Sequence, residues 1–301
     1  MEMITVLLPV LFIFAFGFVG QKFLRIEPRN VSRVAVYLLT PFLAFRTFYE
    51  NEINSDYLYL VLFALGLCFG LISIVYAVSY IKKYSKRETS ALILSSVFMN
   101  NGNYGVPVAL FAFGAPGFDV AIILMVIQSL IMSTVGVYYA AKGSAGRQTG
   151  FKGAALAVLK MPVVYGSAFG ITLQFSAITI PQTFYQSINL VADAAIPTVM
   201  IVLGMQLATI TIKNIEIEKT IYSLMIKLVI APLIAWLIVS QLPVSNLVQS
   251  IMIVMAAIPS AANTTLLSLE YDTKPDFVSS VTLLSTIGSI ITLPIVLAIL
   301  T

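Results

Sequence analysis

The sequence predicts an all-α integral membrane protein with about ten transmembrane helices, arranged as two inverted five-helix repeats. Hydrophobic residues make up 59% of the chain and charged residues only 10%, whereas soluble proteins average roughly 45–50% and about 25%. Apolar residues also come in runs of about twenty, the length that crosses a hydrocarbon layer of about 30 Å. Basic residues occupy every second loop between these runs. Together these observations exclude a soluble fold.

The apolar runs divide the chain into two sets of five spans, separated by charged and turn-forming residues. Residues 1–141 form the first predicted repeat, with spans at 3–24, 31–49, 56–80, 89–114 and 119–141. Residues 142–160 form a basic linker that we expect in the cytoplasm. Residues 161–301 form the second predicted repeat, with spans at 161–175, 187–209, 217–240, 247–269 and 276–300.

Lysine and arginine residues predict the orientation of these spans, because such residues collect on the cytoplasmic side. The alternate loops that hold them contain Lys22, Arg25, Arg29 and Arg33; Lys82, Lys83, Lys86 and Arg87; Lys142, Arg147, Lys152 and Lys160; Lys213 and Lys219; and Lys274. We therefore expect a multi-pass protein of the cell membrane with both termini outside. The net charge of +4 is a topology signal and does not indicate a nucleic-acid partner.

Three pairs of landmarks indicate that the two halves are repeats. The pairs are Pro9 with Pro162, Pro41 with Pro197 and Asp119 with Asp276, at offsets of 153, 156 and 157 residues. Because five is an odd number of spans, the second copy must enter the membrane in the opposite orientation. Inverted repeats are typical of secondary transporters, which bind substrate near the midplane where the repeats meet.

The predicted fourth span contains an unusual cluster of polar and helix-breaking residues. Residues 95–109 read SSVFMNNGNYGVPVA and include Asn100, Asn101, Gly102, Asn103, Gly105 and Pro107. Three amides are costly in hydrocarbon, and unwound backbone is tolerated at that depth only where it is buried in protein or lines a wet cavity. We interpret the cluster as a break at a binding site. The alternative is a kinked helix whose amides bond to neighbouring helices.

The predicted ninth span has a similar break at the equivalent place. Residues 256–266 read AAIPSAANTTL, with Pro259 followed by Ser260, Asn263, Thr264 and Thr265. Two broken helices in inverted repeats are expected to cross near the bilayer centre, where the free N–H groups of their second halves favour anions, carboxylates included. Carbonyl, Asn and Thr oxygens at the same place would alternatively suit Na⁺. An ordinary proline kink is the alternative for this span taken alone.

The segment NNGNYGVP at residues 100–107, followed by FAFGAPGFDVA, resembles the auxin efflux carrier family, particularly its bacterial and archaeal members. The family's asparagine, two glycines and proline map onto Asn100, Gly102, Gly105 and Pro107. Residues 193–208 (DAAIPTVMIVLGMQLA), 227–233 (KLVIAPL) and 258–272 (IPSAANTTLLSLEYD) extend the resemblance over nearly the whole chain.

The resemblance implies crossed fourth and ninth helices, an architecture shared with the bile acid:sodium symporters, and transport of small organic acids. Plant members carry auxin, and bacterial relatives are associated with malate and malonate. This chain lacks the long cytoplasmic loop of many plant members, so auxin is not the substrate that we expect.

Three isolated charges within the spans have two interpretations each. Asp193 is a candidate proton or cation site, or it bonds to a helix end or a neighbour. Lys227 is expected to snorkel to the interface, with ion coupling as the alternative. Arg46 is expected to pair with the nearby Glu50 and Glu52, or else to attract anionic substrate at the outer mouth.

Other polar residues have expected structural roles. Small polar residues often join membrane helices, and we expect this role, rather than a cavity lining, for Gln128, Ser129, Ser285 and Ser289. The chain has no histidine and one cysteine, Cys68, which we expect to be a packing residue. Intrachain disulfides and histidine-based metal or acid–base sites are therefore excluded, so we predict neither an enzyme nor a bound cofactor.

We predict a secondary carrier that moves a small carboxylate by alternating access. The substrate-binding candidates are Asn100, Asn101, Gly102, Asn103, Gly105, Pro107, Pro259, Ser260, Asn263 and Thr264. The ion-coupling candidates are Asp193, Thr265 and Lys227, with H⁺ or Na⁺ as the ion. The alternatives are a sodium-coupled symporter similar to the bile acid symporters and, in another class, a channel or membrane receptor. The lipid bilayer is the other expected partner, and homodimers occur among similar carriers.

Overall fold

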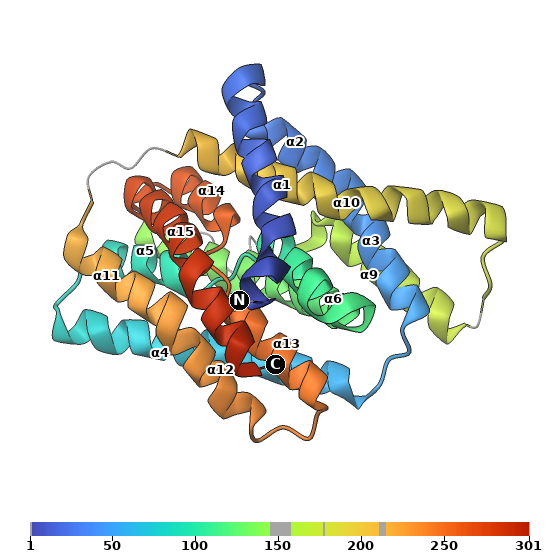
Figure 1. The fold of residues 1–301 in the computed structure, drawn as a ribbon. Helices are drawn as coiled ribbons and strands as arrows, with labels where there is room; N and C mark the ends of the chain where they lie inside the picture. The colour runs from blue at the N-terminus through green and yellow to red at the C-terminus, as the bar shows by residue number, and fades with distance from the viewer. Residues whose placement is uncertain (1, 145–157, 177, 211–214, 301) are drawn as a thin grey trace.

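The computed structural model describes residues 2–144, 158–176, 178–210 and 215–300, and within these ranges every extended element is a helix (Figure 1). Most of the predicted linker, 145–157, lies outside the described residues. The helices form two packed sets, which we call the flank group and the crossing group. In the labels below, η denotes a π-helical turn.

The flank group contains the predicted spans one, two, six and seven. Its helices are α1 (Glu2–Leu24), α2 (Pro28–Val34), which continues through η1 (Ala35–Leu39) into α3 (Thr40–Glu50), α9 (Pro162–Phe175) and α10 (Gln182–Thr209). The main contacts join helices from opposite halves of the chain: α1 packs against α10, and α3 packs against α9 (Figure 1).

Glycines allow these two helix pairs to approach closely, as small residues commonly do in membrane proteins. A Cβ atom on Gly204 would lie 2.0 Å from the backbone oxygen of Phe14, and one on Gly17 would lie 2.2 Å from that of Ile201. On the other pair, a Cβ on Gly166 would lie 2.2 Å from the backbone oxygen of Pro41. Both pairs therefore depend on glycine at their contact points.

The crossing group contains the remaining helices. They are α4 (Ser55–Ile81), α5 (Lys86–Ser96), η2 (Asn101–Gly105), α6 (Val106–Ile131), η3 (Met132–Gly136), α7 (Val137–Gly143), α11 (Ile217–Met225), η4 (Ile226–Ile230), α12 (Ala231–Val239), α13 (Asn246–Ala257), α14 (Ala262–Glu270) and α15 (Pro275–Leu300). Helix α6 is interrupted at Gly114, whose φ of 68° and ψ of −160° suit only glycine. Cys68 is buried within α4, as expected for a packing residue.

Seven helical segments in the described residues are long and apolar enough to cross a membrane. One of them, Asn101–Gly143, runs through the interruption at Gly114 and covers part of the fourth predicted span and all of the fifth. The segments α5, α9, α13 and α14 are too short to count among the seven. The protein is therefore an all-helical, multi-pass membrane protein, and its division into ten spans and two inverted repeats remains a prediction.

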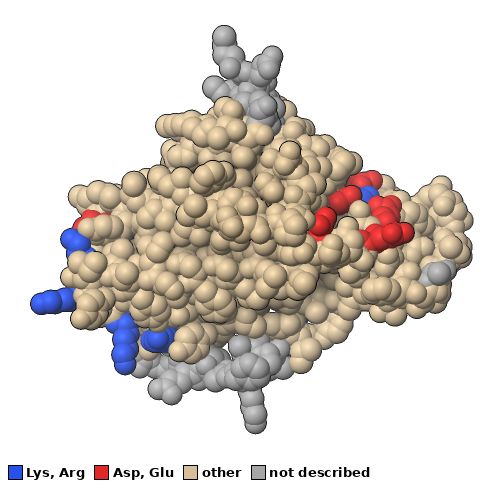
Figure 2. Space-filling model, turned by 90° about the horizontal axis from the view of Figure 1, so that it is seen from below, with Lys and Arg blue, Asp and Glu red and all other residues tan. Residues whose placement is uncertain are grey.

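Charged side chains separate toward opposite ends of the surface in Figure 2. Lys and Arg gather at one end, Asp and Glu lie mainly at the other, and a wide uncharged band lies between them. Many large apolar side chains are exposed, among them Phe12, Phe16 and Trp236. Such a surface would be unfavourable in water and suits a hydrocarbon environment. We refer below to the end that carries the lysines as the basic end.

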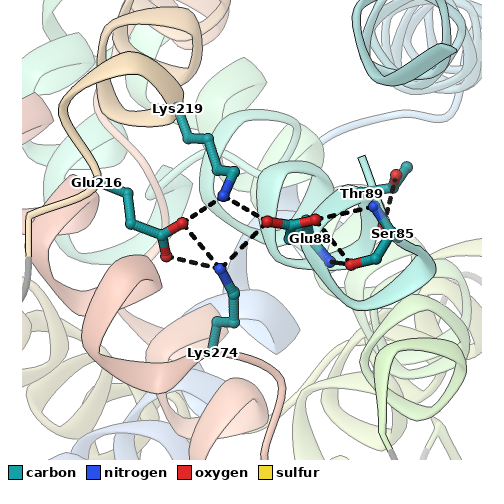
Figure 3. Close-up of polar contacts among 6 residues, drawn as sticks. All are labelled: Ser85, Glu88, Thr89, Glu216, Lys219 and Lys274. Atoms are coloured by element: carbon teal, nitrogen blue, oxygen red, sulfur yellow. Dashed lines mark hydrogen bonds and ion pairs between the residues drawn. The ribbon is translucent and has the colours of Figure 1, made fainter. Parts of the chain in front are cut away.

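A cluster of four charges at the basic end ties the two halves of the crossing group together (Figure 3). Lys219, on α11, pairs with both Glu88, on α5, and Glu216. Lys274, just before α15, lies 2.7 Å from Glu216 and 3.6 Å from Glu88. Glu88 also forms the capping box of α5 with Ser85. One glutamate thus both begins the interrupted helix and fixes it to segments from the second half.

Candidate functional site

The first break lies between α5, which ends at Ser96, and η2, which begins at Asn101. It is narrower than the sequence predicted, because Gly102, Asn103 and Gly105 lie inside the π-helical turn and Pro107 lies in the first turn of α6. Proline is tolerated there, since the N–H that it lacks has no intrahelical partner in a first turn. π-helical turns often occur at functional sites, and this one places three asparagines at the start of a helix.

The second break separates α13, which ends at Ala257, from α14, which begins at Ala262. The two breaks lie side by side and hydrogen-bond as a short antiparallel bridge between Met99 and Ser260. The N–H of Asn100 donates to the carbonyl of Pro259, and the N–H of Ala261 donates to that of Phe98, both at 3.0 Å. Backbone groups exposed by each break are therefore satisfied by the other, as membrane interiors require.

Four serines support this contact; they lie on α5, α11 and α15 and in the second break. The Ser260 hydroxyl donates to the carbonyl of Ser95, and the Ser260 N–H donates to Ser285 Oγ at 3.2 Å. The Ser95 and Ser223 hydroxyls are 2.8 Å apart. All four serines are buried. Ser285 therefore joins helices, as expected, and so does Ser289, whose hydroxyl bonds to the Tyr104 hydroxyl at 2.9 Å.

A cavity of about 90 Å³ lies beside the two breaks, between the crossing group and the flank group. The crossing group contributes Met99, Asn100, Asn101, Gly102, Asn103, Met125, Gln128, Ser129, Met132, Ala261 and Asn263. The flank group contributes Val36, Thr40, Leu43, Met161, Val163, Ala195, Ile196 and Val199. The lining is apolar with a few amides and hydroxyls, and none of these described residues carries a charge.

Two asparagines bring unpartnered polar atoms to this cavity. Asn100 and Asn101 are each only 6% exposed, and both line the cavity. Asn100 Nδ2 and Asn101 Oδ1 are enclosed and have no hydrogen-bond partner among the described residues. An unsatisfied buried polar atom costs about 1–3 kcal/mol. One donor and one acceptor on residues of the cavity lining are therefore left without a partner.

Two helix starts add backbone donors. The first helical hydrogen bond after the first break runs from the N–H of Tyr104 to the carbonyl of Asn100 at 3.1 Å. The N–H groups of Asn101, Gly102 and Asn103 precede it and occupy the positions that have no intrahelical partner. After the second break, the N–H of Asn263 precedes the corresponding bond from Thr264 to Ala261. The positive ends of two helix dipoles thus meet at the cavity.

The structure divides the predicted substrate-binding residues into two sets. Those that line the cavity are Asn100, Asn101, Gly102, Asn103 and Asn263. Those that do not line it are Gly105, Pro107, Pro259, Ser260 and Thr264. The second set has structural contacts: the Thr264 hydroxyl donates to the carbonyl of Ala261 at 2.7 Å, and a Cβ on Gly105 would lie 2.6 Å from Ile258 Cδ1.

The expectation that Lys227 snorkels is wrong. Its side chain lies in η4 and is completely buried, and its Nζ has no hydrogen-bond partner among the described residues. The physical reason is that η4 packs against α13 and α15 within the crossing group, so that the lysine faces protein rather than the interface. It lies one turn beyond Ser223, whose hydroxyl contacts that of Ser95 in the last turn of α5.

The expected pairing of Arg46 with Glu50 and Glu52 is also wrong. Arg46 Nη1 lies 2.6 Å from Asp193 Oδ1, because the packing of α3 on α10 brings this residue from the second half of the chain. The Asp193 side chain is 67% exposed and is not part of the cavity lining. Thr265, the third ion-coupling candidate, lies 3.3 Å from the Thr282 hydroxyl.

Several lining residues were not predicted to bind substrate. Gln128 and Ser129 line the cavity rather than only joining helices, although the Ser129 hydroxyl also donates to the carbonyl of Met125 at 2.8 Å. The flank residues and the methionines of the lining carry no motif that distinguishes them from ordinary packing residues. Methionine is flexible and fills irregular spaces, so its presence in the lining suits an irregular cavity wall.

Comparison with known proteins shows the family to which this chain belongs. The family model described as "Membrane transport protein", which is that of the auxin efflux carriers, matches residues 2–297. An uncharacterized transporter of Methanocaldococcus jannaschii is 24% identical over 284 residues, covering 92% of this chain and 89% of the relative. An uncharacterized transporter of Methanothermobacter thermautotrophicus is 25% identical over 285 residues, covering 93% and 90%. These proteins are named as transporters and not as enzymes. This chain belongs to the membrane transport protein family, the family of the auxin efflux carriers.

Proposed function

We propose that this transporter is a secondary carrier of a small organic anion, with the cavity beside the two breaks as its binding site. The observation that carries the proposal is the pair of unpartnered amide atoms of Asn100 and Asn101 in that cavity. Their location beside two helix starts favours a negatively charged group. A carboxylate would accept hydrogen bonds from Asn100 Nδ2 and from first-turn N–H groups, while Asn101 Oδ1 would accept from a hydroxyl or a bridging water.

The cavity size and lining support a small substrate. Pockets for drug-sized ligands measure about 300–1,000 Å³, whereas this cavity measures about 90 Å³. Its apolar walls suit a short carbon skeleton, and methionine side chains allow some adjustment. We therefore propose a carboxylate of a few carbon atoms as the substrate.

Alternating access would follow from movement of the crossing group against the flank group. The cavity takes its walls from both groups, so their relative displacement would change its shape and its access to each side. The symmetry of the packing supports an inverted repeat: α1 pairs with α10 as α9 pairs with α3, and α6 contacts α13 as α15 contacts α5. If the two predicted repeats are equivalent, the α1–α10 contact corresponds to the α9–α3 contact, and the α6–α13 contact corresponds to the α15–α5 contact.

The coupling ion is H⁺ or Na⁺ in this proposal. Among the three candidates, Lys227 has the most unusual surroundings, because its amine is completely buried and has no hydrogen-bond partner among the described residues. Burying such a group lowers the stability of the fold, so a lysine at this position indicates a functional role. We propose that the basic end faces the cytoplasm. Both termini would then lie on the outer side of the cell membrane. A sodium-coupled mechanism would make transport depend on Na⁺ at constant pH, whereas a proton-coupled one would not.

A thermal-shift screen against small carboxylates tests the binding site, because a ligand that prefers the folded state raises the unfolding temperature. Purified protein would be measured with each acid, with and without Na⁺ and at two pH values. We expect one class of carboxylate to raise the unfolding temperature of the parent, but not that of an Asn100→Ala, Asn101→Ala, Asn263→Ala variant. An equal shift in the triple variant would refute the proposed site. The absence of any shift with organic anions would contradict the substrate class.

A further inference from the structure

A second pocket, of about 280 Å³, lies at the basic end of the crossing group, between the last turns of α4, the first turns of α5 and the end of α7. It shares no lining residue with the cavity beside the breaks. We call it the tyrosine pocket. Its polar lining includes Tyr76, Ser79, Tyr84, Lys86 and Lys142.

The charge of the tyrosine pocket is positive and unbalanced. Lys86 and Lys142 belong to its lining, which contains no acidic residue among those described. The nearby acids on α5 and α11 are already paired: Glu88 with Lys219, and Glu218 with Lys82 at 2.6 Å. An anion in the pocket would therefore meet two ammonium groups without a competing carboxylate.

Aromatic rings hold Lys142 in place at the wall of this pocket. Its Nζ donates to the Tyr76 hydroxyl at 2.7 Å and lies 5.3–5.6 Å from the ring centres of Tyr76, Tyr138 and Tyr139. Cation–π contacts use the charge of the ammonium without consuming its N–H donors. The amine is thus positioned in advance and keeps donors for an anion.

Two hydroxyl groups of the pocket have no partner. Ser79 is 5% exposed, and its Oγ is enclosed without a hydrogen bond to any described residue. The Tyr84 hydroxyl is likewise enclosed and unpartnered. Buried hydroxyls normally find a partner, so both indicate a group with acceptor oxygens that would fill the pocket.

We propose that the tyrosine pocket binds a phosphate group, namely the headgroup phosphate of an anionic phospholipid. A phosphate carries negative charge and several acceptor oxygens, which match two ammonium groups and two free hydroxyls. The lipid source is favoured by Tyr80, another lining residue, which is 88% exposed at the end of a long apolar helix. Tyrosines in such positions mark the membrane–water interface, and basic pockets between transmembrane helices bind anionic headgroups.

The test measures the unfolding temperature of the purified full chain in detergent with added phosphatidylglycerol, phosphatidylcholine or soluble glycerol phosphate. We expect phosphatidylglycerol to stabilise the protein more than phosphatidylcholine does. Stabilisation by glycerol phosphate as well would show that the phosphate alone is sufficient, whereas stabilisation by the lipid alone would identify the lipid as the source. No preference for phosphatidylglycerol over phosphatidylcholine, with no effect of glycerol phosphate, would overturn the proposal.

Variants locate the effect. A Ser79→Ala, Lys86→Ala double variant should bind phosphatidylglycerol at least about tenfold more weakly, the loss expected for one charge-assisted hydrogen bond. The Lys83→Ala control removes a positive charge from the turn just before α5 without touching the lining, and should keep its affinity within about twofold. A double variant that responds to phosphatidylglycerol as the parent does would place the lipid elsewhere and overturn the proposal.

Discussion

Asn100 and Asn101 occupy adjacent positions and have complementary unpartnered atoms, a donor on the first and an acceptor on the second. The bridge between the breaks pairs the N–H of Asn100 and that of Ala261, but these two side-chain atoms have no hydrogen-bond partner among the described residues. Leaving them unpaired costs about 1–3 kcal/mol each. At the residue scale, the site is therefore identified by two lining amides that lack hydrogen-bond partners.

Replacing Asn100 with alanine should abolish stabilisation by the substrate while leaving the ligand-free protein as stable as the parent, or up to about 1–3 kcal/mol more stable. The reason is that the variant loses an unpaired donor and no side-chain hydrogen bond. Unfolding temperatures with and without substrate measure both effects. Asn189→Ala is the matched control, since Asn189 also has an unpartnered Oδ1 but does not line the cavity. A substrate-induced shift retained in Asn100→Ala would contradict the assignment.

Lys227→Met should leave the protein as stable as the parent or raise its stability by about 1–4 kcal/mol, since an apolar side chain of similar length replaces a buried amine without a partner. We expect transport to be lost if the lysine couples the ion. Thermal unfolding and uptake by the same preparation separate the two effects. The control is Leu228→Met, at the next residue of η4, which should change thermal stability and uptake only slightly. Normal uptake by Lys227→Met would exclude the coupling role.

Helix pairing in the flank group depends on a few glycines. Gly204→Ala would place a Cβ 2.0 Å from the backbone oxygen of Phe14, so α1 and α10 must separate, at a cost of about 1–3 kcal/mol. Gly20→Ala should act in the opposite direction, because no atom lies within 4 Å of its added Cβ and alanine favours helix by about 0.5–1 kcal/mol. Thermal unfolding of the two variants compares them directly. Equal stability would show that the close approach of α1 and α10 is not required.

The four-charge cluster at the basic end should make stability depend on pH. Burial raises the pKa of Glu88, but hydrogen bonds from Lys219 and Ser85 outweigh it and lower the pKa from 4.5 to about 2. A carboxyl with a lowered pKa in the folded state stabilises the protein above its ordinary pKa, and this contribution is lost as the pH falls from about 4.5 toward 2. The unfolding temperature of Glu88→Gln should therefore be lower than that of the parent at pH 7, and the difference should narrow in acid.

Glu52→Gln is the control for this pH dependence, since Glu52 is exposed and has no ion pair among the described residues. Its unfolding temperature should follow that of the parent at every pH. A Glu88→Gln variant as stable as the parent at pH 7 would show that the cluster is dispensable.

At the scale of elements, the sequence predicted the helices well and their partners poorly. Span ends agree with the structure to within a few residues for α1, α4 and α15, because composition and loop charges define them locally. Both breaks were predicted from Pro259 and from the polar cluster at residues 100–107. The pairing of Arg46 with Asp193 and the burial of Lys227 were not, because they depend on which helix faces meet after folding.

The part of the cavity lining that comes from the flank group could not be predicted either, because it also depends on which helix faces meet after folding. The asparagines of the lining stand out in an apolar span, whereas Thr40, Met161 and Ile196 resemble any other residue of a membrane helix. They line the site only because the flank group packs beside the crossing group. Ser260, Gly105 and Thr264 were predicted to bind substrate because they are close in sequence to the lining residues, and their structural roles could not be distinguished from sequence alone.

For the whole molecule, the cavity lies where two packed groups meet, and among the described residues the ion pairs of the four-charge cluster at the basic end lie within the crossing group. This arrangement would allow the crossing group to move as a unit against the flank group while the breaks stay paired. An alternating-access carrier needs such a division, whereas a channel needs a continuous path and no exchange of conformations. Transport kinetics can distinguish the two mechanisms.

Counterflow in proteoliposomes shows whether this protein carries a small carboxylate through the cavity beside the breaks. Vesicles loaded with the unlabelled carboxylate that gives the largest thermal shift would be diluted into labelled substrate. We predict transient accumulation of label by the parent and by Asn189→Ala, but not by the Asn100→Ala, Asn101→Ala, Asn263→Ala variant. Passive equilibration without accumulation would indicate a channel, and accumulation by the triple variant equal to that of the parent would exclude this cavity as the binding site.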